Sequence, residues 1–170
     1  MRAPSVENLE YMVNALGVVL PNNIRRHAAL DLEHNPHTSK HYAFIIDLKT
    51  KRILCYATNL FFKGDGVFPH SSHAEIESLV KYCKSKTITK NKKTLLVVKL
   101  SKTGLSGNSR CCLHCMRFIR NISDSINLRT IHYSMPENVL VELSCSNLVD
   151  SEFRCSSGYE YRKKLRRHCD

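Results

Sequence analysis

Runs of apolar and β-branched residues predict the strands of this chain. Residues 41–49 and 52–62 form two such runs with only two residues between them, a spacing that predicts a β-hairpin. Residues 94–100, TLLVVKL, are almost continuously apolar, which is typical of a central strand buried on both faces. Two further strands are expected to begin at residues 128 and 139. The linker between them, MPEN, is too short for a crossover helix, so these two strands should be antiparallel.

Apolar residues at helical spacing predict three helices, and a basic helix or tail follows after residue 155. The N-terminal segment MRAPSVENLEYMVNALGVVL is amphipathic, and its helix should begin at Ser5. Residues 73–86 follow a loop that contains glycine and proline, and Ser72 is the expected N-cap of that helix. Residues 110–122, RCCLHCMRFIRNI, carry a similar apolar stripe. The third helix therefore begins at a group of cysteines.

The order of these elements is helix, strand, strand, helix, strand, helix, strand, strand. This order predicts a three-layer α/β/α sandwich around a mixed five-stranded sheet. A chain of 170 residues is long enough for one core and short for two, so we expect a single domain. Within it, residues 1–40 should form an N-terminal helical extension, residues 41–148 the core, and residues 149–170 a basic C-terminal tail.

The composition argues against a membrane-spanning or disordered chain, because 42% of the residues are hydrophobic, 24% are charged and no eighteen-residue window is apolar. Acidic residues stand where a secretory signal would be apolar, so we expect a cytoplasmic or nuclear protein. Eight cysteines in such a chain favour metal binding or burial over disulfides, because the cytosol keeps thiols reduced. The net charge of +11 indicates an anionic partner, whether nucleic acid, a nucleotide or a membrane surface.

The heptapeptide SRCCLHC contains several pairs that could ligate a metal. Cys112 and Cys115 are three residues apart and lie on one face of a helix, whereas Cys111 lies about 100° around it. His73 also begins a helix after a loop, and a buried strand separates the two helices in sequence. Both helix starts can then meet on one sheet face, which predicts His73, Cys112 and Cys115 as the ligands. Pairing Cys111 with Cys115 would leave Cys112 without a role. Pairing Cys111 with His114 would be half of a zinc-finger site, and no second pair in the chain has zinc-finger spacing.

Two thiolates and one imidazole are typical ligands of Zn²⁺, and three protein ligands leave the fourth tetrahedral position for water. Glu75 lies two residues after His73, where it can take a proton from that water. A structural zinc would need a fourth protein ligand. A second group of cysteines and a histidine near the C-terminus has irregular spacing, which predicts buried or idle thiols rather than a second metal site. Its members are Cys145, Cys155, His168 and Cys169.

The motifs HAE at residues 73–75 and CCLHC at residues 111–115 resemble the H-x-E…P-C-x-x-C pattern of the cytidine deaminase-like superfamily of zinc nucleobase deaminases. The likeness covers roughly residues 42–143. One departure is Cys111, which stands where the family has a proline that orders the helix start and ligates nothing. The resemblance implies a cytidine deaminase-like fold and hydrolytic deamination of cytosine, or less favourably of adenine, with Glu75 moving the protons.

The resemblance also implies which residues contact the substrate. Asn59 stands where the family often has an asparagine that contacts the sugar. Ala74 would offer backbone contacts to the edge of the base. An aromatic ring near the pocket loop, from Phe61, Phe62 or Phe68, would stack on the base.

Two basic clusters favour a base within single-stranded DNA or RNA as the substrate. Residues 81–102 contain eight lysines and no acid, and residues 161–168 read YRKKLRRH. The expected nucleic-acid contacts are Lys90, Lys92, Lys93, Arg162, Lys163, Lys164, Arg166 and Arg167. One alternative is a salvage deaminase of free cytidine or dCMP, a pyrimidine nucleotide, and another is a non-enzymatic nucleic-acid-binding module with structural zinc. No membrane partner is expected, and assembly into a homo-oligomer stays open.

Overall fold

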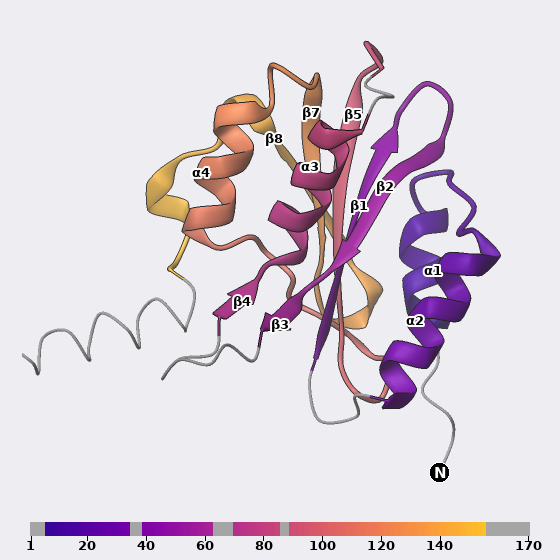
Figure 1. The fold of residues 1–170 in the computed structure, drawn as a ribbon. Coiled ribbons are helices and arrows are strands. Elements are labelled where there is room, and N and C mark those ends of the chain that lie inside the picture. The colour runs from indigo at the N-terminus through magenta and orange to yellow at the C-terminus, as the bar shows by residue number, and fades with distance from the viewer. Residues whose placement is uncertain (1–5, 35–38, 63–69, 86–88, 156–170) are drawn as a thin grey trace, which may run out of the picture.

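The computed structural model describes residues 6–34, 39–62, 70–85 and 89–155, and in them a sheet lies between two pairs of helices (Figure 1). The helices are α1 (Glu7–Asn14), α2 (Asn22–His34), α3 (Ala74–Lys84) and α4 (Leu113–Ile122). The strands are β1 (Lys40–Asp47), β2 (Arg52–Thr58), β3 (Leu60–Phe62), β4 (His70–Ser72), β5 (Lys93–Leu100), β6 (Ser106–Gly107), β7 (Leu128–Ser134) and β8 (Leu140–Ser144). Short 3₁₀ turns follow at η1 (Pro136–Asn138), η2 (Cys145–Asn147) and η3 (Asp150–Glu152). No helix in these ranges is long and apolar enough to cross a membrane.

The main sheet has the strand order β2-β1-β5-β7-β8, and the short β6 pairs with the end of β5. β1 is antiparallel to both β2 and β5, while β5 and β7 are parallel and connected through α4. β7 and β8 are antiparallel. The predicted mixed sheet, the β1–β2 hairpin and the antiparallel final pair are therefore confirmed.

β5 is buried on both faces, as its apolar run predicts, and it separates two cores. Leu95 and Val97 face α3 and α4, and belong to a core that includes residues of both helices. Leu96 and Val98 face α1 and α2, and belong to a second core. Because successive side chains of a strand point to opposite faces, one strand serves both cores. The two helix pairs and the sheet between them form the three predicted layers (Figure 1).

The N-terminal extension contains two helices where the sequence pattern predicted one. α1 ends at Asn14, and Gly17 then adopts a left-handed conformation with φ of +73°, which glycine reaches without steric cost. Pro21 follows, directly before α2. The N-cap of α1 is Val6, and the predicted start at Ser5 lies outside the described residues. The prediction of a single helix was wrong because the glycine turn and the proline divide the segment.

The predicted second strand is divided at Asn59. The Asn59 side-chain oxygen accepts a hydrogen bond from the His41 backbone N–H at 2.9 Å, and the Asn59 N–H donates to the His41 carbonyl at 3.2 Å. Beyond this point the chain leaves the main sheet, and β3 pairs with β4 as a separate ribbon. β4 ends at Ser72, and the next residue, His73, is the N-cap of α3.

Lys93 requires a correction, because it cannot contact nucleic acid as predicted. Its side chain is fully buried at the start of β5, close to the ring of Tyr82. Its ammonium donates hydrogen bonds to three backbone carbonyl oxygens. They belong to Thr89 (2.6 Å), Asn91 (2.7 Å) and Ile126 (2.9 Å). These carbonyls satisfy the buried charge, so Lys93 joins the loops at this end of the sheet instead of facing solvent.

We expect Lys93→Met to lower the free energy of unfolding by about 2 to 5 kcal/mol, because three backbone carbonyls, that of Ile126 among them buried, lose their shared donor. Urea denaturation followed by circular dichroism measures this change. Lys90→Met is the matched control, since Lys90 is exposed, and it should stay within about 0.5 kcal/mol of the wild type. Equal stability of the two variants would show that the Lys93 hydrogen bonds do not hold this end of the fold.

Candidate metal centre

Two helix starts bring the three predicted ligand residues together. His73 is the N-cap of α3 and has an extended backbone, and Cys112 is the N-cap of α4 with a similar conformation. Cys115 lies in the first turn of α4. Both helices pack against the same core on one face of the sheet. Ser72, the predicted N-cap of α3, precedes the cap by one residue, and its hydroxyl instead donates a hydrogen bond to Glu77.

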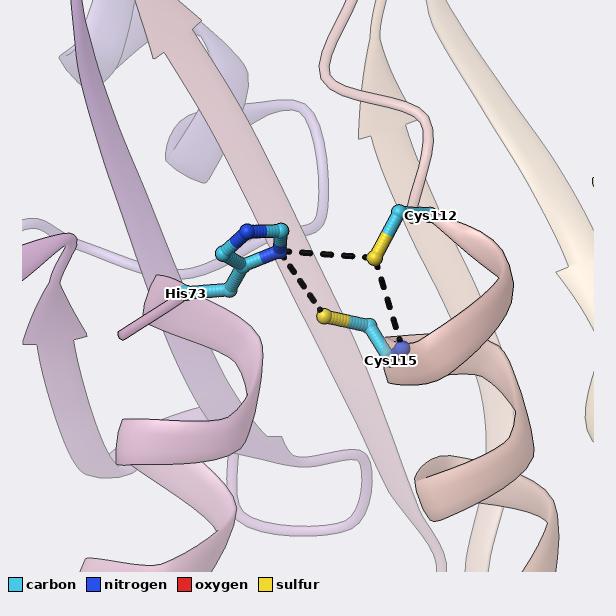
Figure 2. A group of neighbouring side chains, drawn as sticks. All are labelled: His73, Cys112 and Cys115. Atoms are coloured by element: carbon cyan, nitrogen blue, oxygen red, sulfur yellow. Dashed lines mark hydrogen bonds between the residues drawn. The ribbon is translucent and has the colours of Figure 1, made fainter. Parts of the chain in front are cut away.

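The His73 ring points its Nδ1 atom at both sulfur atoms (Figure 2). Nδ1 lies 3.2 Å from the Cys115 Sγ and 3.4 Å from the Cys112 Sγ, and the three atoms all lie within 4.8 Å of one another. Nitrogen and sulfur ligands around a tetrahedral zinc ion are about 3.6 Å apart, from metal–ligand distances of about 2.0 and 2.3 Å. Within the described part of the chain this is the one group that could hold a metal ion.

Hydrogen bonds at the start of α4 stabilise negative charge on Cys112. The Cys112 pKa is lowered to about 4, chiefly by the hydrogen bond from the Cys115 side chain, with further help from His73 and from the Cys115 backbone N–H. The hydrogen bond to Cys112 is also the main cause of a raised His73 pKa. The Cys115 pKa is raised because its thiol donates to Cys112 and because it is buried. The lowered pKa favours the thiolate form of Cys112, which a bound cation would neutralise.

Glu75 lies in the first turn of α3 and is only 2% exposed. Its Oε2 atom is buried and has no hydrogen-bond partner among the residues that the structure describes. Burial raises the pKa of the carboxyl, while the nearby His73 ring lowers it. A buried carboxyl with an oxygen that no protein group satisfies is unusual. Its position beside the three ligands makes it a candidate acid or base.

Cys111 does not join the ligand group among the described residues. Its side chain is buried and interacts with the carboxyl of Glu75, and burial is the main cause of its strongly raised pKa. The spacing argument that set Cys111 apart from Cys112 and Cys115 therefore agrees with the geometry.

The residues predicted to contact a substrate are only partly described. Asn59 bonds the backbone of His41, whose ring has its pKa lowered by burial, by Lys99 and by the charge of His73. Ala74 is the first residue of α3 and is fully buried. Phe61 belongs to β3, and Phe68 lies outside the described residues.

The predicted nucleic-acid contacts lie away from the metal centre or outside the described residues. His41 marks the metal end of the sheet, where it pairs with Lys99 near the end of β5. Lys90 and Lys92 precede β5, which has eight residues, so they lie roughly 20 Å away along the strand. Lys92 lines a separate cavity of about 480 Å³ together with Arg120 and Arg129. The predicted contacts beyond residue 155 are Arg162, Lys163, Lys164, Arg166 and Arg167, and none of them is described.

A cavity of about 590 Å³ adjoins the metal centre. Its lining includes Cys111 and Cys112, together with Glu152 and Cys155 from the segment after β8. Two arginines that the sequence analysis did not single out, Arg110 and Arg154, also line it. Arg110 could have been found from its position beside the cysteines, whereas no sequence signal places Arg154 at this cavity.

The second cysteine group forms no metal site in the part of the chain that is described. Cys145 is buried, and burial raises its pKa to about 11. Cys155 lines the cavity beside the metal centre without joining a ligand group there. His168 and Cys169 lie outside the described residues.

The α/β fold and this group of three side chains are thus the features from which a function can be argued. No family model, no curated protein and no solved structure matches the chain.

Proposed function

We propose that this chain is a zinc-dependent hydrolytic deaminase that converts the amine of a nucleobase into a carbonyl, with cytosine favoured over adenine. The observation that carries the proposal is the buried Glu75 carboxyl, which has an unpartnered oxygen beside a three-residue metal-binding group. An H-x-E and a C-x-x-C motif, each at a helix start on one face of a mixed sheet, support a cytidine deaminase-like fold.

Zinc is the metal that the ligand set favours, because one imidazole nitrogen and two thiolates are typical zinc ligands. His73, Cys112 and Cys115 would hold it. When bound, zinc supplies a Lewis acid that makes water a good nucleophile near neutral pH.

Glu75 is the residue that moves protons in the proposed reaction. Its carboxylate accepts a proton from the attacking water and gives it to the ring nitrogen of the base. A second proton passes through Glu75 to the amine, which leaves as ammonia. Water and the amino base are consumed, and the keto base and ammonia are formed.

The ligand count favours an enzyme over a nucleic-acid-binding module with structural zinc. A closed structural site has four protein ligands. In the described ranges no fourth cysteine, histidine or carboxylate joins His73, Cys112 and Cys115. The fourth position is then available to water, as a hydrolytic reaction requires.

The net charge of +11 supports a polynucleotide as the first candidate substrate. A free nucleotide is the second candidate, and one observation favours it. Lys90 and Lys92 precede β5, whereas His41 pairs with Lys99 near the other end of that strand, so these two lysines give no support for a strand bound at the metal centre.

Purified protein should contain one zinc per chain and deaminate at least one cytosine substrate. Zinc is measured by plasma mass spectrometry. Mass-resolved product analysis compares cytidine, dCMP, single-stranded DNA, duplex DNA and tRNA side by side, with the matching adenine compounds included. Absence of turnover on every substrate by protein that carries a full complement of zinc would reject the proposed reaction.

A further inference from the structure

The 590 Å³ cavity has a wall in common with the metal centre. Cys112, one of the three ligand residues, lines it directly, and Cys111 beside it also contacts Glu75. The volume lies within the range of roughly 300 to 1,000 Å³ that is usual for small-molecule sites. A molecule whose base is bound at the metal centre would reach this cavity past Cys112, the one ligand residue that lines it.

Arg110 is held in place at the cavity wall. Its guanidinium lies over the ring of Phe153, 5.0 Å from the ring centre, and Phe153 is itself buried in the core. Arg110 forms an ion pair with Glu152 at 3.7 Å, and both side chains are more than one third exposed. Such exposed pairs contribute little, so Arg110 is oriented by the ring while its charge remains available to an anion.

Arg154 lines the same cavity and comes from the segment that follows η3. Its backbone carbonyl accepts a hydrogen bond from the Leu113 N–H at 2.8 Å, which fixes this segment against the first turn of α4. Apart from the metal ligand Cys112, the charged side chains among the described lining residues are two arginines and one exposed glutamate, so positive charge is in excess on this part of the wall. Guanidinium groups bind phosphate through paired hydrogen bonds, and the N-terminal end of α4 adds a favourable dipole.

We infer that Arg110 and Arg154 form a phosphate subsite beside the metal centre, so that the substrate is a nucleotide rather than a nucleoside. This inference rests on the proposed function, because it takes the base to be bound at the metal centre. The phosphate is either the monoester of a free nucleotide or a diester within a single strand. Both present the same oxygens to the two arginines.

Arg110→Gln and Arg154→Gln test the subsite, with Arg26→Gln as the matched control, since Arg26 is exposed on α2 across the sheet. Binding of dCMP, of a thymidine oligonucleotide with one central cytidine, and of cytidine is measured by isothermal titration calorimetry on zinc-loaded protein. Each cavity variant should weaken binding of at least one phosphate-bearing ligand by about tenfold or more. Cytidine binding should change less than twofold, and Arg26→Gln should match the wild type.

The two sources of phosphate give different results. If the variants lose affinity only for dCMP, the subsite binds a phosphate monoester. If they lose affinity for the oligonucleotide, and the slope of log K against log salt concentration becomes smaller by about 0.7, the subsite binds a phosphodiester of a strand. Wild-type binding of both ligands by both variants, or an equal loss for cytidine, would overturn the inference. Arg154→Gln leaves the backbone bond to Leu113 intact, so it remains informative if Arg110→Gln loses stability with its ring contact. Arginine-dependent binding without any turnover would keep the subsite and reject the proposed deamination.

Discussion

Glu75→Gln is expected to retain wild-type zinc content while lowering kcat for deamination by about 10² to 10⁴-fold, the usual contribution of general acid–base catalysis. Glutamine has nearly the same shape as glutamate and cannot exchange protons. The ligand residues His73, Cys112 and Cys115 are untouched, so zinc binding and proton transfer are separated in one variant. Zinc content and single-turnover rates on the best substrate measure the two properties.

Glu33→Gln is the matched control for this experiment, because Glu33 is exposed on α2, across the sheet from the metal centre. It should reproduce the wild-type rate and zinc content. The proposed mechanism requires that only the Glu75 variant loses turnover. A Glu75→Gln rate within threefold of the wild type would assign the proton transfers to another group.

The sequence predicts those parts of the fold that depend on burial of long apolar runs. Every β5 residue that belongs to either core is apolar, so the sequence alone predicts that this strand lies in the middle of the sheet. α2 was missed although Ile24, Ala28 and Leu32 are spaced by four residues and are buried. Its other positions are mostly polar, so a narrow apolar stripe had to be recognised next to a proline and a glycine.

The break at Asn59 could not be predicted, because it depends on a hydrogen bond to His41, eighteen residues earlier. The Asn59 side chain takes the place of a backbone partner in the strand pairing. Such a bond does not change the pattern of apolar and polar residues, so the pattern does not predict it. Lys93 is a similar case, because it resembles its exposed neighbour Lys92 in sequence, whereas its buried ammonium bonds two carbonyls of the preceding loop and the distant carbonyl of Ile126.

The ligand group was predictable because its geometry is almost entirely local. Cys112 and Cys115 are fixed relative to each other by one helical turn, and His73 only has to begin a second helix on the same sheet face. Arg154 shows the opposite case. It lies 42 positions after Cys112 and reaches the cavity because the segment after β8 returns to α4, where Asp150 binds Arg117 and Arg120. Long-range ion pairs of this kind cannot be inferred from spacing.

Cys112→Ser is expected to weaken zinc binding by at least about 100-fold, whereas Cys111→Ser should retain one zinc per chain. Loss of a thiolate ligand exceeds the 10- to 100-fold effect of removing a group that only orients a ligand. Cys111 contacts Glu75 and stands outside the ligand group, so its replacement leaves the metal-binding atoms in place. Both variants replace one sulfur atom with oxygen, at adjacent positions, so each is a control for the other.

Competition with a chromophoric chelator gives the zinc affinity of each variant, and thermal melting with and without EDTA gives the stability that the metal contributes. Wild type and Cys111→Ser should both melt at lower temperature when EDTA is added, because a ligand that binds only the folded state stabilises it. The melting temperature of Cys112→Ser should fall less on addition of EDTA, because less zinc is bound to begin with. If Cys111→Ser lost its zinc while Cys112→Ser kept it, the ligand pair would be Cys111 and Cys115, and α4 would have to begin one residue earlier to present them.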